Sequence, residues 1–272
     1  MEQIEGIKGR YRLIGGSSPL PEITREQARG LEKRLNEKGH SFKSYVGMRY
    51  GHPLIEETLR EILEAGLREA VAIPMAPFRS RASTGAYIEE VNRALKELGG
   101  ELRITFVEGW HIHPLFTRAV RERIEEGLKE FSPEAGKRIH LIFSAHSLPK
   151  SVIETDRYVK DMEEGVKKVL EGMRAFPWRI AFQSKGRGPE EWIGPEVESV
   201  LAGLSEKGVR EALIVPIGFV SDHIEILYDI DVLFQEKARS LGMVLKRTRS
   251  LNASGRFIEA LASAVEQNLQ KG

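Results

Sequence analysis

The chain contains no cysteine among its 272 residues, which excludes disulfides, thiolate-bound zinc and cysteine-bound iron–sulfur clusters. It also lacks any run of about 18 apolar residues, so no membrane-spanning helix is predicted. The N-terminal segment has no apolar stretch of the kind found in signal peptides, and we therefore expect a cytoplasmic protein. A formal net charge of only +1 argues against bulk electrostatic capture of nucleic acid, but leaves peripheral contact with a membrane open.

The composition that remains is typical of a soluble globular protein. Hydrophobic residues make up 41% of the chain and charged residues 30%, close to the averages for such proteins. This length suits one large domain or two small ones, and either arrangement can bury a sizeable core.

Strand-like and helix-like segments alternate along the chain, which predicts an α/β protein with parallel sheets covered by helices on both faces. The expected strands are 43–50, 69–76, 102–108, 138–147, 178–184, 211–218 and 243–248. The expected helices are 53–66, 84–98, 114–131, 156–171, 195–206, 222–240 and 254–269. A further helix is expected to begin near Thr24, after a loop rich in Gly, Ser and Pro.

Two segments resemble each other: "GLREAVAIPMA" at 66–76 and "GVREALIVPIG" at 208–218 share Gly, Arg, Glu, Ala and Pro in register. We interpret them as parts of two related units, with chance similarity between buried strands as the alternative. The expected division is an N-terminal Rossmann-like domain at 1–133, a second at 134–252, and a C-terminal helix at 253–272 that packs back on the first domain.

The comparison of the two halves also reveals a gap. In the second half, strand 138–147 precedes strand 178–184, but its counterpart in the first half would lie before Met1. We therefore expect the first sheet to lack one strand, either because the start of the chain is short or because the element is lost. Such a loss would leave apolar faces and backbone groups unpaired.

Polar side chains gather where the expected strands end, and ligands of parallel α/β sheets bind beyond those ends. The candidates are Arg79, Ser83, His146, Gln183, Ser184, Trp192, Asp222, His223, Glu225, Asp229 and Asp231. Structural alternatives exist: a buried histidine, a core tryptophan, a solvated arginine loop, and a helix-capping box formed by Asp222 and Glu225. Capping does not explain Asp229, whose spacing from those two residues places all three on one helix face. Stacked carboxylates favour a metal path or a proton relay.

Several motifs together resemble those of the ferrochelatase family. They are "SAHSLP" at 144–149, "QSKG…WIGP" at 183–195, "GFVSDHIEILYDID" at 218–231, "RYRLIGGSSPL" at 10–20 and "PFRSRASTGAY" at 77–87. The N-terminal strand and helical lip typical of this family have no counterpart in the chain.

The resemblance implies two Rossmann-like domains that hold a porphyrin between them and insert Fe²⁺ into it. The porphyrin, protoporphyrin IX or coproporphyrin III, and ferrous iron would be substrates, and no tightly bound cofactor is expected. His146 and Glu225 would form the catalytic pair on opposite sides of the flat macrocycle. The implied metal ligands are His146, Glu225, Asp229 and Asp231, and the implied substrate contacts are Ser18, Arg79, Ser83, Gln183, Ser184, Trp192, Asp222 and His223.

The chemistry expected of this pair is the removal of pyrrole protons. A neutral His146 could accept them, while Asp222 and Asp229, as like charges, would raise the pKa of Glu225. Two other functions stay open: a related tetrapyrrole chelatase with another metal, and a non-catalytic porphyrin- or heme-binding paralogue. A bilobal solute-binding protein is disfavoured because no signal peptide is found.

Overall fold

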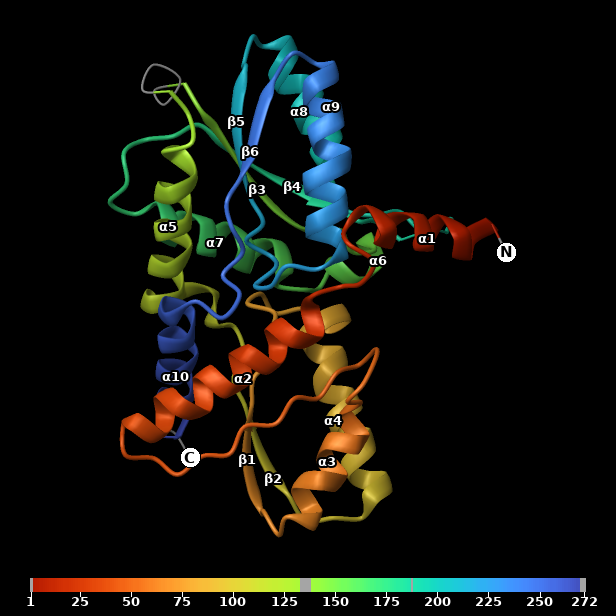
Figure 1. Ribbon diagram of the computed structural model, residues 1–272, viewed down its shortest axis with the longest axis vertical. Helices are drawn as coiled ribbons and strands as arrows, with labels where there is room; N and C mark the ends of the chain where they lie inside the picture. Colours follow the sequence, from red (N-terminus) through yellow and green to blue (C-terminus); the bar gives the residue numbers. More distant parts are fainter. Residues whose placement is uncertain (1, 133–137, 187, 270–272) are drawn as a thin grey trace.

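A computed structural model describes residues 2–132, 138–186 and 188–269. It is an α/β structure with two separate parallel sheets, one above the other in Figure 1. The strands are β1 (Glu69–Ala72), β2 (Arg103–Phe106), β3 (His140–His146), β4 (Trp178–Gln183), β5 (Glu211–Val215) and β6 (Val244–Arg247).

Helices separate the strands, as the sequence predicts. The α-helices are α1 (Glu2–Leu13), α2 (Leu20–Glu37), α3 (Ile55–Glu64), α4 (Ala86–Leu98), α5 (Pro114–Leu128), α6 (Lys150–Ile153), α7 (Tyr158–Leu170), α8 (Val197–Glu206), α9 (Gln235–Ser240) and α10 (Gly255–Leu269). Two π-helices, η1 (Arg81–Gly85) and η4 (Glu225–Phe234), and a 3₁₀ turn, η2 (Trp110–Ile112), complete the described elements.

The second sheet has the strand order β4-β3-β5-β6, and every neighbouring pair is parallel. Its central strand β3 is buried at every residue before His146, as expected of a strand covered by helices on both faces. The register places His146 beside Gln183 at the carboxyl edge of the sheet. Two candidate residues, His146 and Gln183, thus lie side by side at this edge.

The first sheet contains only β1 and β2 among the described residues, paired in parallel from Glu69↔Arg103 to Ala72↔Phe106. The prediction of a strand at 43–50 is wrong, because that segment forms only an isolated bridge between Met48 and Leu54. An extended segment becomes a strand only when a neighbouring strand satisfies its backbone groups. The described residues provide no such neighbour for 43–50.

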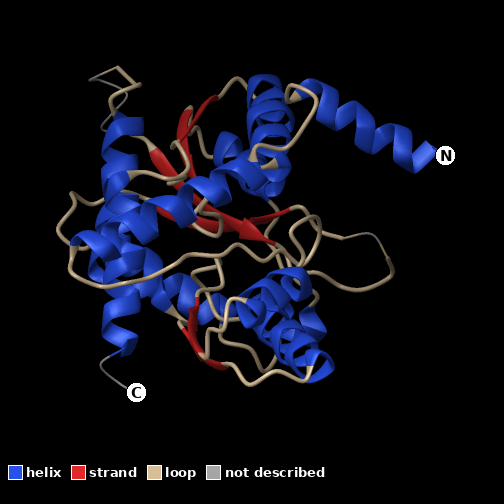
Figure 2. Ribbon diagram, turned by 60° about the horizontal axis from the view of Figure 1, so that its bottom comes forward, coloured by secondary structure: helices blue, strands red, loops and turns tan. Residues whose placement is uncertain are grey.

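Helices cover both faces of the first sheet (Figure 2). On one face, Leu35 of α2 packs with Ala262 and Val265 of α10, next to Val71 of β1. On the other face, α3 and α4 cover Ala70. The α10 helix therefore completes the covering of a sheet that lies far from it in the sequence; the last residues of the predicted 253–272 helix, 270–272, lie outside the described residues.

A single hydrophobic cluster joins the two halves. It includes Phe78 and Trp110 from the first half, Phe143 and Met162 from the second, and Phe257 from α10. The predicted boundary between 133 and 134 lies outside the described residues, so the division into domains stays a prediction. No helix among the described residues is long and apolar enough to cross a bilayer.

The N-terminal segment differs from the prediction. The α1 helix spans residues that we expected in a loop, and α2 begins at Leu20 rather than near Thr24. Glu, Gln, Lys and Arg in "EQIEGIKGRYRL" favour a helix strongly enough to offset its two glycines. Pro21 lies in the first turn of α2. Backbone N–H groups have no partner within the helix at that position, so the N–H that proline lacks is not missed.

Candidate active site

His146 is the last residue of β3, and its side chain is about one-third exposed. Its Nδ1 contacts the carbonyl oxygen of Ser147, while the Tyr158 hydroxyl donates a hydrogen bond to the His146 carbonyl oxygen at 3.0 Å. Because Nδ1 faces an acceptor, it carries the proton in the neutral ring, and Nε2 is left as the basic atom.

Glu225 begins the π-helix η4 and receives contacts from several elements. Its Oε1 lies 3.5 Å from Nε2 of His146, and its Oε2 lies 3.5 Å from Nε2 of His223. The side-chain amide of Gln183 donates to the Glu225 carbonyl oxygen at 2.7 Å. The Glu225 carboxylate is thus held by His146 from β3 and by His223 from the segment that precedes η4, while Gln183 from β4 holds the Glu225 backbone.

The contact between His146 and Glu225 corrects the expectation that they lie on opposite sides of a macrocycle. A planar ring between two groups needs a van der Waals distance of about 3.5 Å on each side. The 3.5 Å separation of Nε2 and Oε1 leaves no room for it. The two side chains therefore form a unit, which we call the His146 pair.

The π-helical form of η4 also corrects the capping interpretation. The residue before its first turn is Ile224, and no side-chain cap is formed, so Asp222 and Glu225 do not make a capping box. Short π-helices occur often at functional sites, because they re-aim side chains within a helix. Here Glu225 and Asp229, four residues apart, both stay in the site.

The pKa values of the His146 pair move in opposite directions. Burial alone lowers the pKa of His146, but the hydrogen bond and the charge of Glu225 outweigh burial and raise it above its ordinary value. Burial alone raises the pKa of Glu225, but His146 and His223 lower it to about 2. The prediction that acidic neighbours raise the pKa of Glu225 is therefore wrong, because two imidazoles contact the carboxylate directly.

Asp229 is the carboxylate to which the like-charge argument applies. It is only 8% exposed; burial and the charge of Glu225 raise its pKa, against a hydrogen bond from Ser184 that lowers it. The Ser184 hydroxyl donates directly to Asp229. The Ser184 backbone adopts φ 57°, a conformation uncommon for residues other than glycine and frequent at functional sites.

Asp222 and Asp231 are turned toward the segment that follows β6. The Asp222 carboxylate accepts hydrogen bonds from Ser250 at 2.7 Å and from the Asn252 amide at 2.8 Å. Asp231 forms a two-point ion pair with Arg247, at 2.7 and 2.8 Å. Asp229 therefore bonds to Ser184, the residue after Gln183, whereas Asp222 and Asp231 bond to residues on or after β6.

The candidates of the first half have other partners. The Ser18 hydroxyl accepts the N–H of Leu20 at the start of α2. Arg79 forms a two-point ion pair with Asp161, at 2.7 and 3.0 Å. The hydroxyl of Ser83 is buried without a hydrogen-bond partner, which is rare in folded proteins and can mark a group that awaits a ligand.

Trp192 lies next to the loop that follows His146, because residues 192 and 149 form a β-bridge. Its indole ring covers Gly186, where a Cβ atom would come within 2.4 Å of the ring. The indole N–H is buried and unpartnered. A side chain at position 186 would displace this ring, so glycine is required there to keep Trp192 in place.

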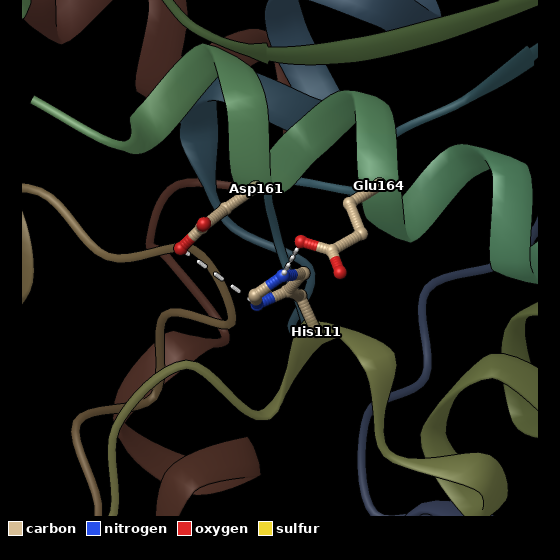
Figure 3. Close-up of side chains that lie close together, drawn as sticks. All are labelled: His111, Asp161 and Glu164. Carbon is tan, nitrogen blue, oxygen red and sulfur yellow. Dashed lines mark ion pairs between the residues drawn. The ribbon is translucent and has the colours of Figure 1, made fainter.

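A second group of histidine and carboxylates lies where η2 meets α7 (Figure 3). We call His111, Asp161 and Glu164 the His111 cluster; their ligand-type atoms lie within 4.8 Å of one another. Nδ1 of His111 is 3.8 Å from Asp161, and Nε2 is 3.6 Å from Glu164. No local sequence motif marks this group.

The charges around Asp161 disfavour a cation there. Asp161 is fully buried and already pairs with Arg79 and with Arg157, at 3.1 Å. Two guanidinium groups more than neutralise one carboxylate, so a divalent metal would meet no net attraction from it. Burial lowers the pKa of His111. We interpret the cluster as an electrostatic connection between the two halves.

Two residues of the site were missed by the sequence reading. Tyr158 is buried, and burial raises the pKa of its hydroxyl, which therefore remains a donor to His146. Arg10 of α1 lies 5.1 Å from the ring of Tyr228, and its charge lowers the pKa of Asp229. Tyr158 lies in an amphipathic helix, where it is indistinguishable from a core residue, and Arg10 lies in a segment that we expected to be a loop.

Comparison with known proteins decides what kind of protein has this geometry. A family model described as Ferrochelatase matches residues 1–269. The chain belongs to the ferrochelatase family. A ferrochelatase of Deinococcus radiodurans is 39% identical over 267 residues, covering 97% of this chain and 84% of the relative. A coproporphyrin III ferrochelatase of a Geobacillus strain is 37% identical over 273 residues, covering 99% and 88%.

Solved structures show the same fold at much lower sequence identity. SirB from Bacillus subtilis with Fe³⁺ superposes with a TM-score of 0.65 and 14% identity, covering 90% of this chain and 88% of SirB. The sirohydrochlorin chelatase SirB in complex with cobalt gives a TM-score of 0.63, also at 14% identity, covering 92% of this chain and 90% of SirB. The predicted α/β fold with parallel sheets flanked by helices is thereby confirmed as a chelatase fold.

Proposed function

We propose that this member of the ferrochelatase family inserts ferrous iron into a porphyrin, with the His146 pair receiving the displaced protons. The observation that supports it best is the 3.5 Å contact between Nε2 of His146 and Glu225 at the carboxyl edge of the second sheet. In this reaction two pyrrole N–H bonds break, two protons leave, and all four ring nitrogens bind the Fe²⁺ ion, whose two charges replace those of the protons. The iron and the porphyrin are both substrates.

The contacts of the His146 pair support our proposal of how it removes protons. Ser147 occupies Nδ1 of His146, so Nε2 takes the proton. The ionised Glu225, with a pKa of about 2, stabilises the imidazolium that results. Since the contact raises the pKa of His146, it makes the imidazole a stronger base than a free histidine.

Asp229 continues this path away from the pair. Its raised pKa brings it nearer to the range in which it can exchange protons with solvent at neutral pH. We propose that Asp229 either passes protons outward or contacts the incoming metal, together with His146 and Glu225. Because Arg247 holds the Asp231 carboxylate in an ion pair, we propose a supporting role for Asp231.

We further propose that the substrate lies against the residues that surround the pair. Ser83 and Trp192 each have an unpartnered buried polar atom, which suits a bound molecule. Gln183, Ser184 and His223 hold Glu225 and Asp229 in position. Ser18, Arg79 and Asp222 already have protein partners, so we propose indirect roles for them in shaping the site.

The remaining proposals concern organisation and location. We propose one domain at 1–133 and a second at 134–252. This division is supported by the helices that cover each sheet separately. We further propose that the residues from 253 onward pack on α2 of the first domain. We propose a cytoplasmic location, with peripheral contact with a membrane where a porphyrin is delivered, and no nucleic-acid partner.

The test is an anaerobic assay of iron insertion by the purified chain, with protoporphyrin IX and coproporphyrin III supplied separately. Loss of porphyrin absorbance and appearance of heme or coproheme are expected in the presence of Fe²⁺. His146→Ala and Glu225→Gln are each expected to slow insertion about 100- to 10,000-fold. Cobalt and zinc in place of iron would reveal a different metal preference.

Glu164→Gln is the matched control, because Glu164 is also a partly exposed carboxylate next to a buried histidine. It is expected to keep the parent rate. Insertion at the parent rate by both His146→Ala and Glu225→Gln would refute the assignment of the pair. A stable porphyrin complex without any turnover would refute the enzyme function.

A further inference from the structure

The side chain of Gln27 reaches from the first half of the chain to the segment that leads into η4. Gln27 lies on α2 and is only 3% exposed. Its Nε2 donates to the Ser221 hydroxyl oxygen at 2.8 Å and to the Asn252 carbonyl oxygen at 3.1 Å. A carbonyl oxygen only accepts hydrogen bonds, so the amide nitrogen must be the atom that faces Asn252. One buried amide thus joins two segments of the second half to α2.

Asn252 holds the backbone on both sides of Ser221. Its N–H donates to the Val220 carbonyl oxygen at 2.8 Å, and its side-chain oxygen accepts the N–H of Asp222 at 2.9 Å. Asn252 adopts φ 45°, in the left-handed region that asparagine tolerates better than most residues. Such a backbone conformation persists where the surrounding contacts over-determine it. We call Gln27, Ser221 and Asn252 the Ser221 clamp.

The Ser221 clamp reaches the His146 pair through His223. The Ser221 carbonyl oxygen lies 3.0 Å from Nδ1 of His223. This contact occupies Nδ1, and Nε2 faces Glu225, at 3.5 Å from its Oε2. The ring of Phe219 lies against the same imidazole, with the ring centroids 4.9 Å apart. The orientation of the His223 ring therefore depends on where the Ser221 backbone is held.

His223 also supports the first turn of η4. Its carbonyl oxygen accepts the N–H groups of Ile226 at 3.0 Å and of Leu227 at 2.9 Å. Glu225 lies between His223 and these two residues in the chain. A displacement of His223 would therefore shift the backbone of Glu225 together with the imidazole that contacts its carboxylate.

We propose that Gln27 is a positioning residue for iron insertion, which holds Ser221, and through it His223 and Glu225, in the arrangement that the reaction uses. This inference rests on the proposed function of the His146 pair. Gln27 belongs to α2, whereas the reactive side chains belong to the second half. The geometry of the pair therefore depends on the contact between the two halves. A misplacement of about 1 Å can reduce a reaction rate about 100-fold.

The test is Gln27→Met in the full chain, because methionine has a similar shape but cannot donate a hydrogen bond. The variant is expected to lower kcat for iron insertion about 10- to 100-fold, with an unchanged KM for the porphyrin. The melting temperature is expected to fall by no more than about 5 °C. Gln27→Glu keeps an acceptor for the Ser221 hydroxyl but cannot donate to the Asn252 carbonyl, and is expected to be at least as slow.

Hydrogen–deuterium exchange tests the Ser221 clamp without any iron. The amides of Asp222 and Asn252 are bonded within this region. They are expected to exchange at least about tenfold faster in Gln27→Met than in the parent, whereas the amides of β3 keep their rates. A parent chain that inserts no iron would refute the proposed function, and the exchange rates would still decide whether Gln27 holds this segment.

Two controls separate positioning from a general loss of packing. In a His223→Phe background, Gln27→Met is expected to cause no further loss of kcat, because its effect passes through His223. Gln267→Met is the matched control, because the Gln267 side-chain amide also contacts a histidine, His113, at 3.1 Å. This variant is expected to keep the parent kcat and the parent exchange rates at Asp222 and Asn252.

Several outcomes would overturn the inference. The parent kcat in Gln27→Met, or unchanged exchange at Asp222 and Asn252, would show that the clamp does not hold the site. A rise in KM alone would assign Gln27 to substrate binding. A full further loss of kcat in the His223→Phe background would show that Gln27 acts by another route.

Discussion

The molecule contains two groups in which a histidine meets carboxylates, and they differ in almost every other respect. In the His146 pair the imidazole and the carboxylate are each about one-third exposed, and Glu225 has no arginine among the groups that lower its pKa. In the His111 cluster the imidazole is 1% exposed and Asp161 fully buried, with Arg79 and Arg157 bound to the carboxylate.

The difference shows that proximity of histidine and carboxylate does not by itself make a reactive site. Arginines fix the charge of Asp161, and burial lowers the pKa of His111, so this imidazole stays neutral. Glu225 instead contacts His146, and this contact raises the pKa of the imidazole, which makes it a stronger base. The His111 cluster therefore suits a permanent connection between the two halves, and the His146 pair suits proton transfer.

The largest effect is expected from breaking the His146 pair. His146→Ala, Glu225→Gln and the double variant are each expected to reduce the rate of iron insertion about 100- to 10,000-fold, with the double variant close to the single ones. Residues that act as a unit are non-additive, because removal of either one disables the other. Effects that multiply in the double variant would mean that the two residues act independently.

The next effect concerns stability. Asp161→Asn removes a fully buried carboxylate from two partly exposed arginines, Arg79 and Arg157, and is expected to lower the free energy of unfolding by about 2 kcal/mol, since solvent screens the arginines that are left. Urea denaturation measures this change. The activity per folded molecule is expected to stay at the parent value, and a reduced rate at unchanged stability would instead place the His111 cluster in the reaction.

A smaller effect is expected at Ser184. Ser184→Ala removes the hydrogen bond to Asp229, which is worth about 1 kcal/mol, or about a fivefold change in rate. Because that hydrogen bond lowers the pKa of Asp229, its loss is expected to move the acid limb of the pH–rate profile to higher pH. Ser184→Asn keeps a hydrogen-bond donor and tolerates the positive φ of this position, so it serves as the control; an unchanged profile in Ser184→Ala would exclude Asp229 from proton transfer.

The smallest effect compares the two histidines by the pH dependence of stability. The pKa of His146 is raised in the folded protein. Its contribution to the free energy of unfolding is therefore fully present below the ordinary pKa of about 6.5, and is lost as the pH rises through the folded pKa. His111 has a lowered pKa, so its contribution is present above about 6.5 and is lost as the pH falls.

The matched variants His146→Phe and His111→Phe are therefore expected to have opposite pH dependences. Relative to the parent, His146→Phe is expected to be least stable near pH 5, whereas His111→Phe is expected to gain most there. Denaturation at pH 5, 7 and 9 measures both differences. Parallel curves for the two variants would contradict the distinction between the His146 pair and the His111 cluster.

The sequence allowed much of the fold to be predicted, because periodicity and strand-end chemistry are local signals. It singled out His146 and Glu225, which the structure brings into contact, because their motifs follow buried strands. It misjudged the pKa of Glu225, because the distance from His146 is set by the packing of β3 against η4, which spacing along the chain does not reveal. It also missed the His111 cluster, whose members lie about 50 residues apart and meet only after folding.

The position of α10 has a consequence for how the protein is made. Its residues Ala262 and Val265 cover α2 and β1, and its Glu266 forms an ion pair with Lys38 at 2.9 Å. During translation the N-terminal half emerges long before this covering helix. Until the helix emerges and packs, the early half exposes apolar surface that the folded protein buries.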